Sequence, residues 1–72
     1  MPMPEMQPVS SSNIAAVGYD AENQMVYVQF LDGSVYAYKG VPEHEFDNLR
    51  LAPSVGSYLN RNYKNVYPYE RA

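Results

Sequence analysis

The segment from Ser54 to Lys64 carries the side chains best suited to binding chemistry. Arg61 and Lys64 are three positions apart, which places them on one face of a helix where both can approach a phosphate. Tyr58 and Asn60 supply an aromatic ring and an amide, the groups that stack on a nucleobase and read its edge in single-strand recognition. In the competing structural interpretation, Tyr58 packs on a sheet, Asn60 caps local backbone and both cations are solvated.

Residues that could perform catalysis are few, and no set of them has the required spacing. His44 is the only histidine, and it lies between Glu43 and Glu45 with no nucleophile beside it in the sequence. The serines lack a base and an orienting acid. One histidine with surface carboxylates supplies too few ligands for a metal site, and the glycines match no phosphate-binding loop. We therefore expect no enzymatic activity, no metal and no cofactor.

Composition limits the partners that the chain can bind. Its 72 residues include 5 Lys and Arg against 8 Asp and Glu, a net charge of −3, which disfavours nonspecific binding to nucleic acid. The chain has no cysteine, and no apolar run approaches the roughly 20 residues that cross a bilayer. The first eight residues also lack the basic and apolar regions of a signal peptide. We expect a soluble cytoplasmic protein with no membrane partner.

A β-hairpin over residues 25–38 organises the fold, because two runs of β-branched and aromatic residues flank an Asp-Gly pair. Two registers are open: a two-residue type I′ turn, or a three-residue loop whose glycine is left-handed and forms a bulge. The second register is preferred, because it places Tyr36 and Tyr38 on the core face. Val28 then lies opposite the first tyrosine and Val26 opposite the second.

The remaining elements follow in order along the chain. Residues 1–8 hold three prolines and are typical of a flexible arm, so the folded domain is expected to span residues 9–72. The other predicted segments are a strand over 14–20, a helix from Pro42 to Leu51 or Ala52, a second short helix over 55–63 capped by Ser54, and an extended arm or edge strand over 66–72. The predicted architecture is α+β, a three-stranded antiparallel meander packed with one or two short C-terminal helices.

Self-association is expected through the sheet. If the helices cover one face, the residues on the other face are Ile14, Ala16, Tyr27, Val35 and Ala37. That set is too apolar for an ordinary wetted surface, and a small chain without a disulfide gains stability from association. We therefore predict a homodimer, with the alternative that the C-terminal arm or the second helix folds back over this face.

Several short motifs of the chain occur in the same order in one protein family. They are Ser11-Ser12-Asn13-Ile14 before the first strand, Gly18-Tyr19-Asp20 at its end, Val28-Gln29-Phe30 and Gly33 in the hairpin, Tyr36-Ala37-Tyr38 in its second strand, Val41-Pro42 at the helix start, Ser54-Val55-Gly56-Ser57-Tyr58-Leu59-Asn60, and Tyr67-Pro68-Tyr69. Together they resemble the KTSC domain from about Val9 to Glu70, with Leu59 where the family often has Phe.

The resemblance implies a small noncatalytic module with an RNA-binding role. The family includes C-terminal extensions of some lysyl-tRNA synthetases and short stand-alone bacterial or phage proteins, and this chain looks like the stand-alone form. RNA or a nucleotide-like ligand is thus one expected partner. The alternative is a protein-interaction or small-ligand-binding module, for example a phage-encoded inhibitor. The candidate binding residues are Tyr36, Tyr38, Tyr58, Asn60, Arg61 and Lys64.

Overall fold

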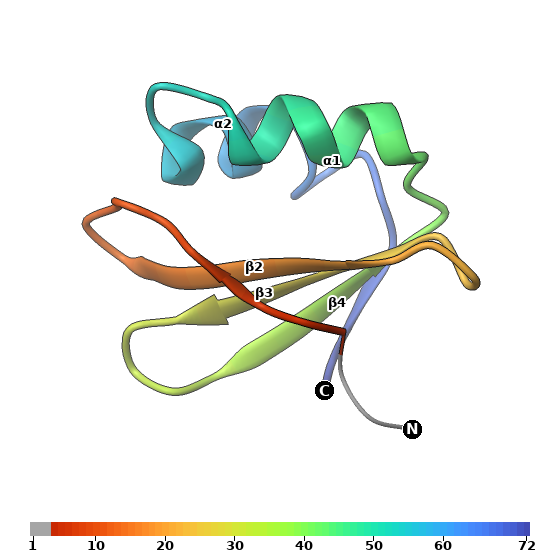
Figure 1. Cartoon of the computed structure of the whole chain (residues 1–72), viewed down its shortest axis with the longest axis horizontal. Helices are drawn as coiled ribbons and strands as arrows, with labels where there is room; N and C mark the ends of the chain where they lie inside the picture. The colour runs from red at the N-terminus through yellow and green to blue at the C-terminus, as the bar shows by residue number, and fades with distance from the viewer. Residues whose placement is uncertain (1–3) are drawn as a thin grey trace.

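The computed structural model describes residues 4–72, which form one antiparallel sheet of five strands and two helices that cover one of its faces (Figure 1). The strands follow one another in chain order across the sheet. Their bounds are β1 Gln7–Pro8, β2 Ile14–Asp20, β3 Met25–Phe30, β4 Val35–Lys39 and β5 Tyr69–Arg71, and the helices are α1 Glu43–Arg50 and α2 Val55–Asn62. The α+β class is therefore confirmed.

The central hairpin of β3 and β4 adopts the bulged register. Val28 pairs with Tyr36, and Val26 pairs with Tyr38. Gly33 has a φ of 94°, a left-handed conformation that glycine adopts at no steric cost. The Phe30 amide donates to the Ser34 carbonyl at 2.8 Å and closes a three-residue loop. The preferred register is therefore correct.

The prediction of three strands is wrong, because two short strands extend the sheet at its edges. In β1, Gln7 pairs with Val17 and Pro8 pairs with Ala16, so part of the predicted arm over 1–8 forms an edge strand. Proline fits there because an edge strand does not need every N–H for the sheet. β5 pairs with β4 on the other side, as the edge-strand alternative for the C-terminal segment anticipated. Residues 1–3 of the predicted arm lie outside the described residues.

Ile14 belongs to the core and not to the helix-free face on which the sequence placed it. The pairing shifts between Ile14 and Ala16: Ile14 lies opposite Phe30, whereas Ala16 lies opposite Gln29. The extra residue turns Ile14 toward the helices, where only 1% of its surface is exposed. Ala16 stays on the helix-free side. The proposed self-association through that side stays a prediction. A light-scattering mass of two chains would support it, and a mass of one chain would contradict it.

Both helices begin where local signals place them. Pro42 precedes α1 with a φ of −70°, and Glu43 and Glu45 lie in the first turn, where carboxylates favour the positive helix end. Ser54 caps α2, because its side chain accepts a hydrogen bond from the Ser57 amide at 3.4 Å. α1 is two or three residues shorter than predicted, and α2 is one residue shorter.

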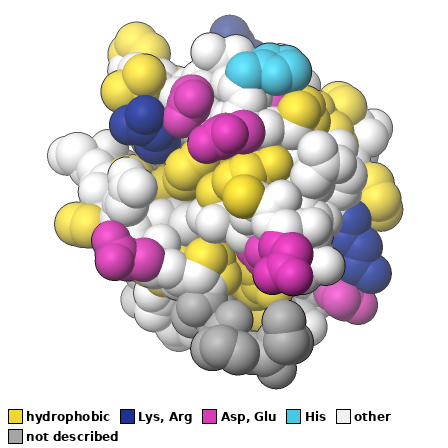
Figure 2. Space-filling model, turned by 45° about the vertical axis from the view of Figure 1, so that its right-hand side comes forward, with side chains coloured by type: hydrophobic (Ala, Val, Ile, Leu, Met, Phe, Trp, Pro, Cys, Tyr) yellow, Lys and Arg dark blue, Asp and Glu magenta, His cyan; other side chains and the backbone are white. Residues whose placement is uncertain are grey.

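Two of the basic side chains form ion pairs, and the basic side chains on one face of the molecule do not cluster. Within residues 4–72, Lys39 pairs with Glu70 at 3.4 Å and Arg50 pairs with Asp47 at 3.0 Å. On the face drawn in Figure 2, the basic side chains are separated from one another and acidic side chains lie between them. This face therefore has no basic patch.

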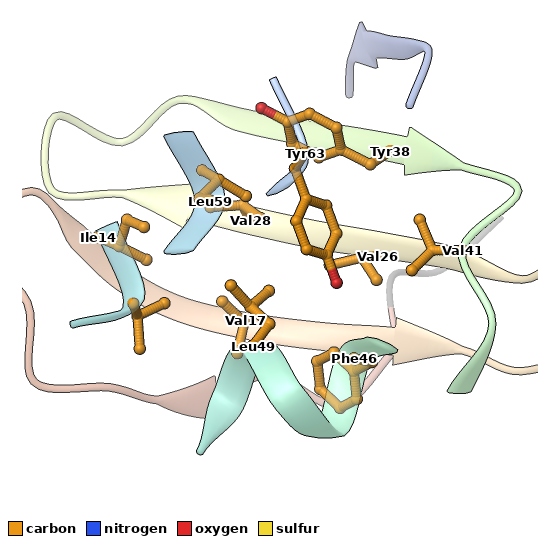
Figure 3. Close-up of a cluster of buried hydrophobic side chains, with 11 residues drawn as sticks. Ile14, Val17, Val26, Val28, Tyr38, Val41, Phe46, Leu49, Leu59 and Tyr63 are labelled. Carbon is orange, nitrogen blue, oxygen red and sulfur yellow. The ribbon is translucent and has the colours of Figure 1, made fainter. Parts of the chain in front are cut away.

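The interior is a cluster of aliphatic and aromatic side chains between the sheet and the helices, with Tyr63 near its centre (Figure 3). Its members are Ile14, Val17, Val26, Val28, Tyr38, Val41, Phe46, Leu49, Val55, Leu59 and Tyr63. The Tyr63 hydroxyl donates to the Glu45 carbonyl of α1 at 3.1 Å, so the buried phenol has a polar partner. The segment after α2 is thereby fixed to α1.

Gly18 makes room for the N-terminal segment on the helix-free face of the sheet. Because Val17 points into the core, a side chain at Gly18 would point the other way. A Cβ atom there would come within 2.6 Å of the Met6 sulfur and 2.8 Å of the Glu5 carbonyl oxygen. Figure 1 shows this segment crossing to the side of the sheet opposite the helices. The absence of a side chain thus allows the crossing.

We expect Gly18→Val to displace the N-terminal segment and to destabilise the chain by about 1–3 kcal/mol, the usual cost of overpacking. Urea unfolding measures the cost, and limited proteolysis detects release of the segment. In a chain that lacks residues 2–6, the same substitution should cost much less, because the contacts with Met6 and Glu5 are gone. An equal loss of stability in both chains would show that Gly18 is not needed to make room for the N-terminal segment.

Candidate binding groove

A groove of about 410 Å³ lies between α2 and the sheet. Four separate parts of the chain line it: the turn before β2, the central hairpin, α2 with the residues after it, and β5. The lining residues are Asn13, Phe30, Tyr36, Tyr38, Gly56, Leu59, Asn60, Lys64 and Tyr69. The groove therefore exists only when the edge strand and the second helix are both in place.

The sheet side of the groove is a continuous aromatic wall. Tyr36 meets Phe30 edge-on, with ring centroids 5.7 Å apart, and it meets Tyr69 at the same distance with a tilt of 58°. Tyr38 contacts Tyr69 at 5.3 Å. Alternation along β4 places both of its tyrosines on one face, and the pairing of β5 brings Tyr69 opposite Tyr38. A planar ligand that enters the groove therefore meets aromatic surface.

The tyrosines of the aromatic wall become less exposed from the rim of the groove toward its floor. Tyr69 is 51% exposed, Tyr36 is half-buried, and Tyr38 is 3% exposed. Burial, followed by the nearby Tyr69 and Tyr36 hydroxyls, raises the pKa of the Tyr38 phenol. Tyr38 is thus a neutral floor residue, while the outer two tyrosines present the rings that a ligand can reach.

The helix side of the groove is polar. Asn60 and Lys64 are four positions apart and both are exposed. Among the described lining residues, Lys64 is the only charged one, and its ammonium makes none of the ion pairs found in residues 4–72. The groove thus places one cation and an amide opposite the aromatic wall.

Gly56 brings α2 close to the turn before β2. A Cβ atom at Gly56 would lie 2.8 Å from the Asn13 side-chain oxygen and 3.4 Å from the Ser11 hydroxyl oxygen. The Ser11 hydroxyl also donates to that Asn13 oxygen at 3.1 Å, which fixes the amide at this end of the groove. Close packing therefore accounts for a glycine in the first turn of a helix, where it otherwise costs stability.

The structure brings together four of the six residues that the sequence suggested. Tyr36, Tyr38, Asn60 and Lys64 line the groove. Arg61 does not join Lys64, because α2 ends at Asn62 and the chain turns before Lys64 is reached. The helical spacing that predicts a shared face for the two cations applies only within the helix.

The other two suggested residues lie beside a second, smaller hollow. Tyr58 and Arg61 line a space of about 270 Å³ next to Ser54 and Ser57. The Tyr58 hydroxyl donates to the Glu45 carboxylate at 2.6 Å, and that bond raises the pKa of the phenol. Tyr58 therefore has a structural role, but its hydroxyl connects α2 to α1, whereas the structural interpretation predicted packing on the sheet.

Sequence reasoning missed the other lining residues as binding residues. Phe30 could have been predicted from the sequence, because the bulged register places it beside Tyr36. Tyr69 reaches the groove only because β5 pairs with β4, and the sequence left this segment open between an extended arm and an edge strand. Asn13 and Gly56 come from distant parts of the chain, so only the tertiary fold brings them together.

The remaining candidates for chemistry are dispersed. His44 lies on the exposed side of α1. In the part of the chain that the structure describes, no group of three or more His, Asp or Glu side chains could hold a metal ion. Over the same residues, no helix has both the length and the apolar character needed to cross a membrane.

Comparison with known proteins finds one matching domain family and several similar proteins. The KTSC domain profile matches residues 10–67. A protein of Tsukamurella paurometabola is 46% identical over 55 residues, which are 76% of this chain and 82% of that protein. An uncharacterized protein of Stutzerimonas stutzeri is 36% identical over 56 residues, 78% of this chain and 79% of the relative.

Two further matches are to a much longer protein and to a solved structure. A lysine–tRNA ligase of Nostoc punctiforme is 33% identical over 60 residues, which are 83% of this chain but 11% of the ligase. The crystal structure of a KTSC domain protein from Yersinia pestis superposes with a TM-score of 0.90 at 37% identity, and the match covers 94% of this chain and 96% of that one. The fold described above is therefore that of a solved relative.

Proposed function

We propose that this chain, which belongs to the KTSC domain family, is a noncatalytic module that binds single-stranded RNA in the groove between α2 and the sheet. The observation that carries the proposal is the pairing of an aromatic wall with an amide and a cation across one groove. Proteins bind unpaired bases by stacking them on aromatic rings, bonding their edges and neutralising a phosphate. The groove offers a group for each of these contacts.

Most of the sequence motifs that resemble the family contribute a residue to this groove. Asn13 comes from the first motif, Tyr36 and Tyr38 from the Tyr-x-Tyr motif, Asn60 from the motif over α2, and Tyr69 from the last. Distant segments that share one surface support a common role for that surface. Because one relative is named as a lysine–tRNA ligase, tRNA is the RNA to test first.

The charge of the chain limits the length of RNA that it can hold. A net charge of −3 opposes a long polyanion, and the basic side chains on the face drawn in Figure 2 are too far separated to form a track for a backbone. We therefore propose contact with an unpaired stretch or an end of the RNA, and not with a duplex.

We expect Lys64→Ala to weaken binding of a short single-stranded RNA about tenfold or more, because it removes the one charged hydrogen bond donor of the groove. Fluorescence anisotropy with a labelled oligonucleotide at low salt measures the affinity. The logarithm of the association constant should fall with the logarithm of salt concentration with a slope of about −0.7 per contacted phosphate. A slope near that value corresponds to a single contact.

Arg61→Ala is the matched control, since it removes an exposed cation from the opposite side of α2. Arg61→Ala makes the net charge more negative by the same amount as Lys64→Ala, but it should leave the affinity for the RNA nearly unchanged. Equal losses in the two variants would point to nonspecific attraction. An absence of binding by the parent chain to single-stranded RNA and to tRNA would overturn the proposed function.

A further inference from the structure

We infer that the unit recognised by the groove is one nucleotide, with its base on the aromatic wall and its phosphate at Lys64. This inference rests on the proposed function and narrows its ligand. The same unit can come from a free nucleoside monophosphate or from one unpaired nucleotide of an RNA, and the two sources present the same chemistry to the groove.

The size of the groove fits one such unit. Its volume of about 410 Å³ lies near the lower end of the roughly 300–1,000 Å³ that small-molecule sites occupy. The wall consists of four aromatic residues around this one space, so it provides one platform and not a row of platforms along a strand. A second stacked base would have to lie outside the groove.

The tilts of the wall leave ring surface available for stacking. Tyr36 and Tyr69 are inclined at 58°, and Phe30 meets Tyr36 at 87°, so none of these rings lies flat on its neighbour. Tyr69, on the edge strand, is the most exposed member. A base can therefore stack on the outer tyrosines, while Asn60 on the opposite side supplies a donor and an acceptor for its edge.

The cations indicate a single phosphate contact. Lys64 lies in the groove, whereas Lys39 is paired with Glu70 and Arg50 with Asp47. Arg61 lines the other hollow, and Arg71, which lies opposite Tyr36 in β5, is not among the residues that line the groove. The one cation that lines the groove, beside one aromatic platform, matches the phosphate and base of one nucleotide.

Calorimetric titration of the full chain tests the inference, with AMP, adenosine, inorganic phosphate and a single-stranded hexanucleotide as separate probes. AMP should bind with a stoichiometry of one. Adenosine should bind about tenfold more weakly, because it lacks the phosphate, and phosphate alone should bind below detection. The hexanucleotide should bind no more than about tenfold more tightly than AMP.

Two variants locate the site. Lys64→Ala should reduce AMP affinity to that of adenosine, and Tyr69→Ala should weaken AMP and adenosine alike, because it removes part of the stacking surface. Leu51→Ala changes a 70% exposed side chain outside the groove and should change nothing. Circular dichroism of all three confirms that they fold.

The outcomes separate this inference from the proposed function. Hexanucleotide binding without AMP binding, or hexanucleotide binding that survives Tyr69→Ala, would overturn the one-nucleotide unit and leave RNA binding intact. A failure of both AMP and RNA to bind would overturn both. AMP binding that Lys64→Ala and Tyr69→Ala leave unchanged would place the ligand elsewhere and reject the inference.

Discussion

Tyr63→Ala should leave a chain that is largely unfolded in water. Tyr63 has no exposed surface and is the largest fully buried side chain among the described residues. Its ring contacts Tyr38 at 5.6 Å and Tyr67 at 5.2 Å, and it lies at the centre of the core in Figure 3. Truncation of a buried aromatic residue costs about 3–5 kcal/mol. A core of this size supplies little more than that, so the loss approaches the whole free energy of unfolding.

Urea unfolding followed by circular dichroism measures the effect, with two controls. Tyr63→Phe keeps the ring and loses one hydrogen bond to Glu45, so it should cost about 1 kcal/mol. Tyr69→Ala removes a half-exposed tyrosine at the sheet edge and should cost far less than Tyr63→Ala. A Tyr63→Ala chain with an unfolding midpoint near that of the parent would contradict the central position of this ring.

Local signals in the sequence were sufficient for the hairpin and the helices. The left-handed conformation at Gly33 and the alternation of Tyr36 and Tyr38 both act within a few residues, and together they select one register. Ser54 is likewise a local signal, because its side chain bonds an amide three residues later. These features follow from short-range physical chemistry and were predicted correctly.

Features that depend on distant neighbours could not be predicted in this way. β1 and β5 have two and three residues, and each exists because an adjacent strand supplies hydrogen bonds. The shift between Ile14 and Ala16 has no marker in its own residues, yet it decides which face Ile14 occupies. Strand existence and strand register at these positions are therefore properties of the assembled sheet.

The candidate groove shows the same division. Spacing placed Tyr36 and Tyr38 on one face, and the groove contains both. The approach of α2 to the turn at Asn13 requires the small residue Gly56, but its partner is not visible from the helix sequence. Lys64 lines the groove without Arg61 because α2 ends at Asn62 and the chain turns before Lys64. The two tyrosines of β4 thus follow from periodicity, whereas the approach of α2 and the place of Lys64 follow from packing.

Raising the pH above about 10 should destabilise the fold steeply, with Tyr63 as the main cause. Burial, followed by the nearby Glu45 carboxylate, raises the pKa of the Tyr63 phenol far above its ordinary value. Below about pH 10, this phenol is protonated in both the folded and the unfolded chain, so its contribution to stability is fully present. Above that pH, the unfolded chain releases a proton that the folded chain retains. The free energy of unfolding then falls with rising pH.

The expected slope for Tyr63 is about 1.4 kcal/mol per pH unit, which corresponds to one proton. Burial also raises the pKa of Tyr38, so the parent chain should lose stability faster than one phenol alone predicts. Urea midpoints between about pH 8 and pH 11 give the slope, and tyrosinate absorbance reports when the buried phenols ionise. Tyr63→Phe removes one titrating group, so its stability should decline less steeply above pH 10 than that of the parent. Parallel pH profiles for the two chains would show that Tyr63 ionises in the folded state without penalty.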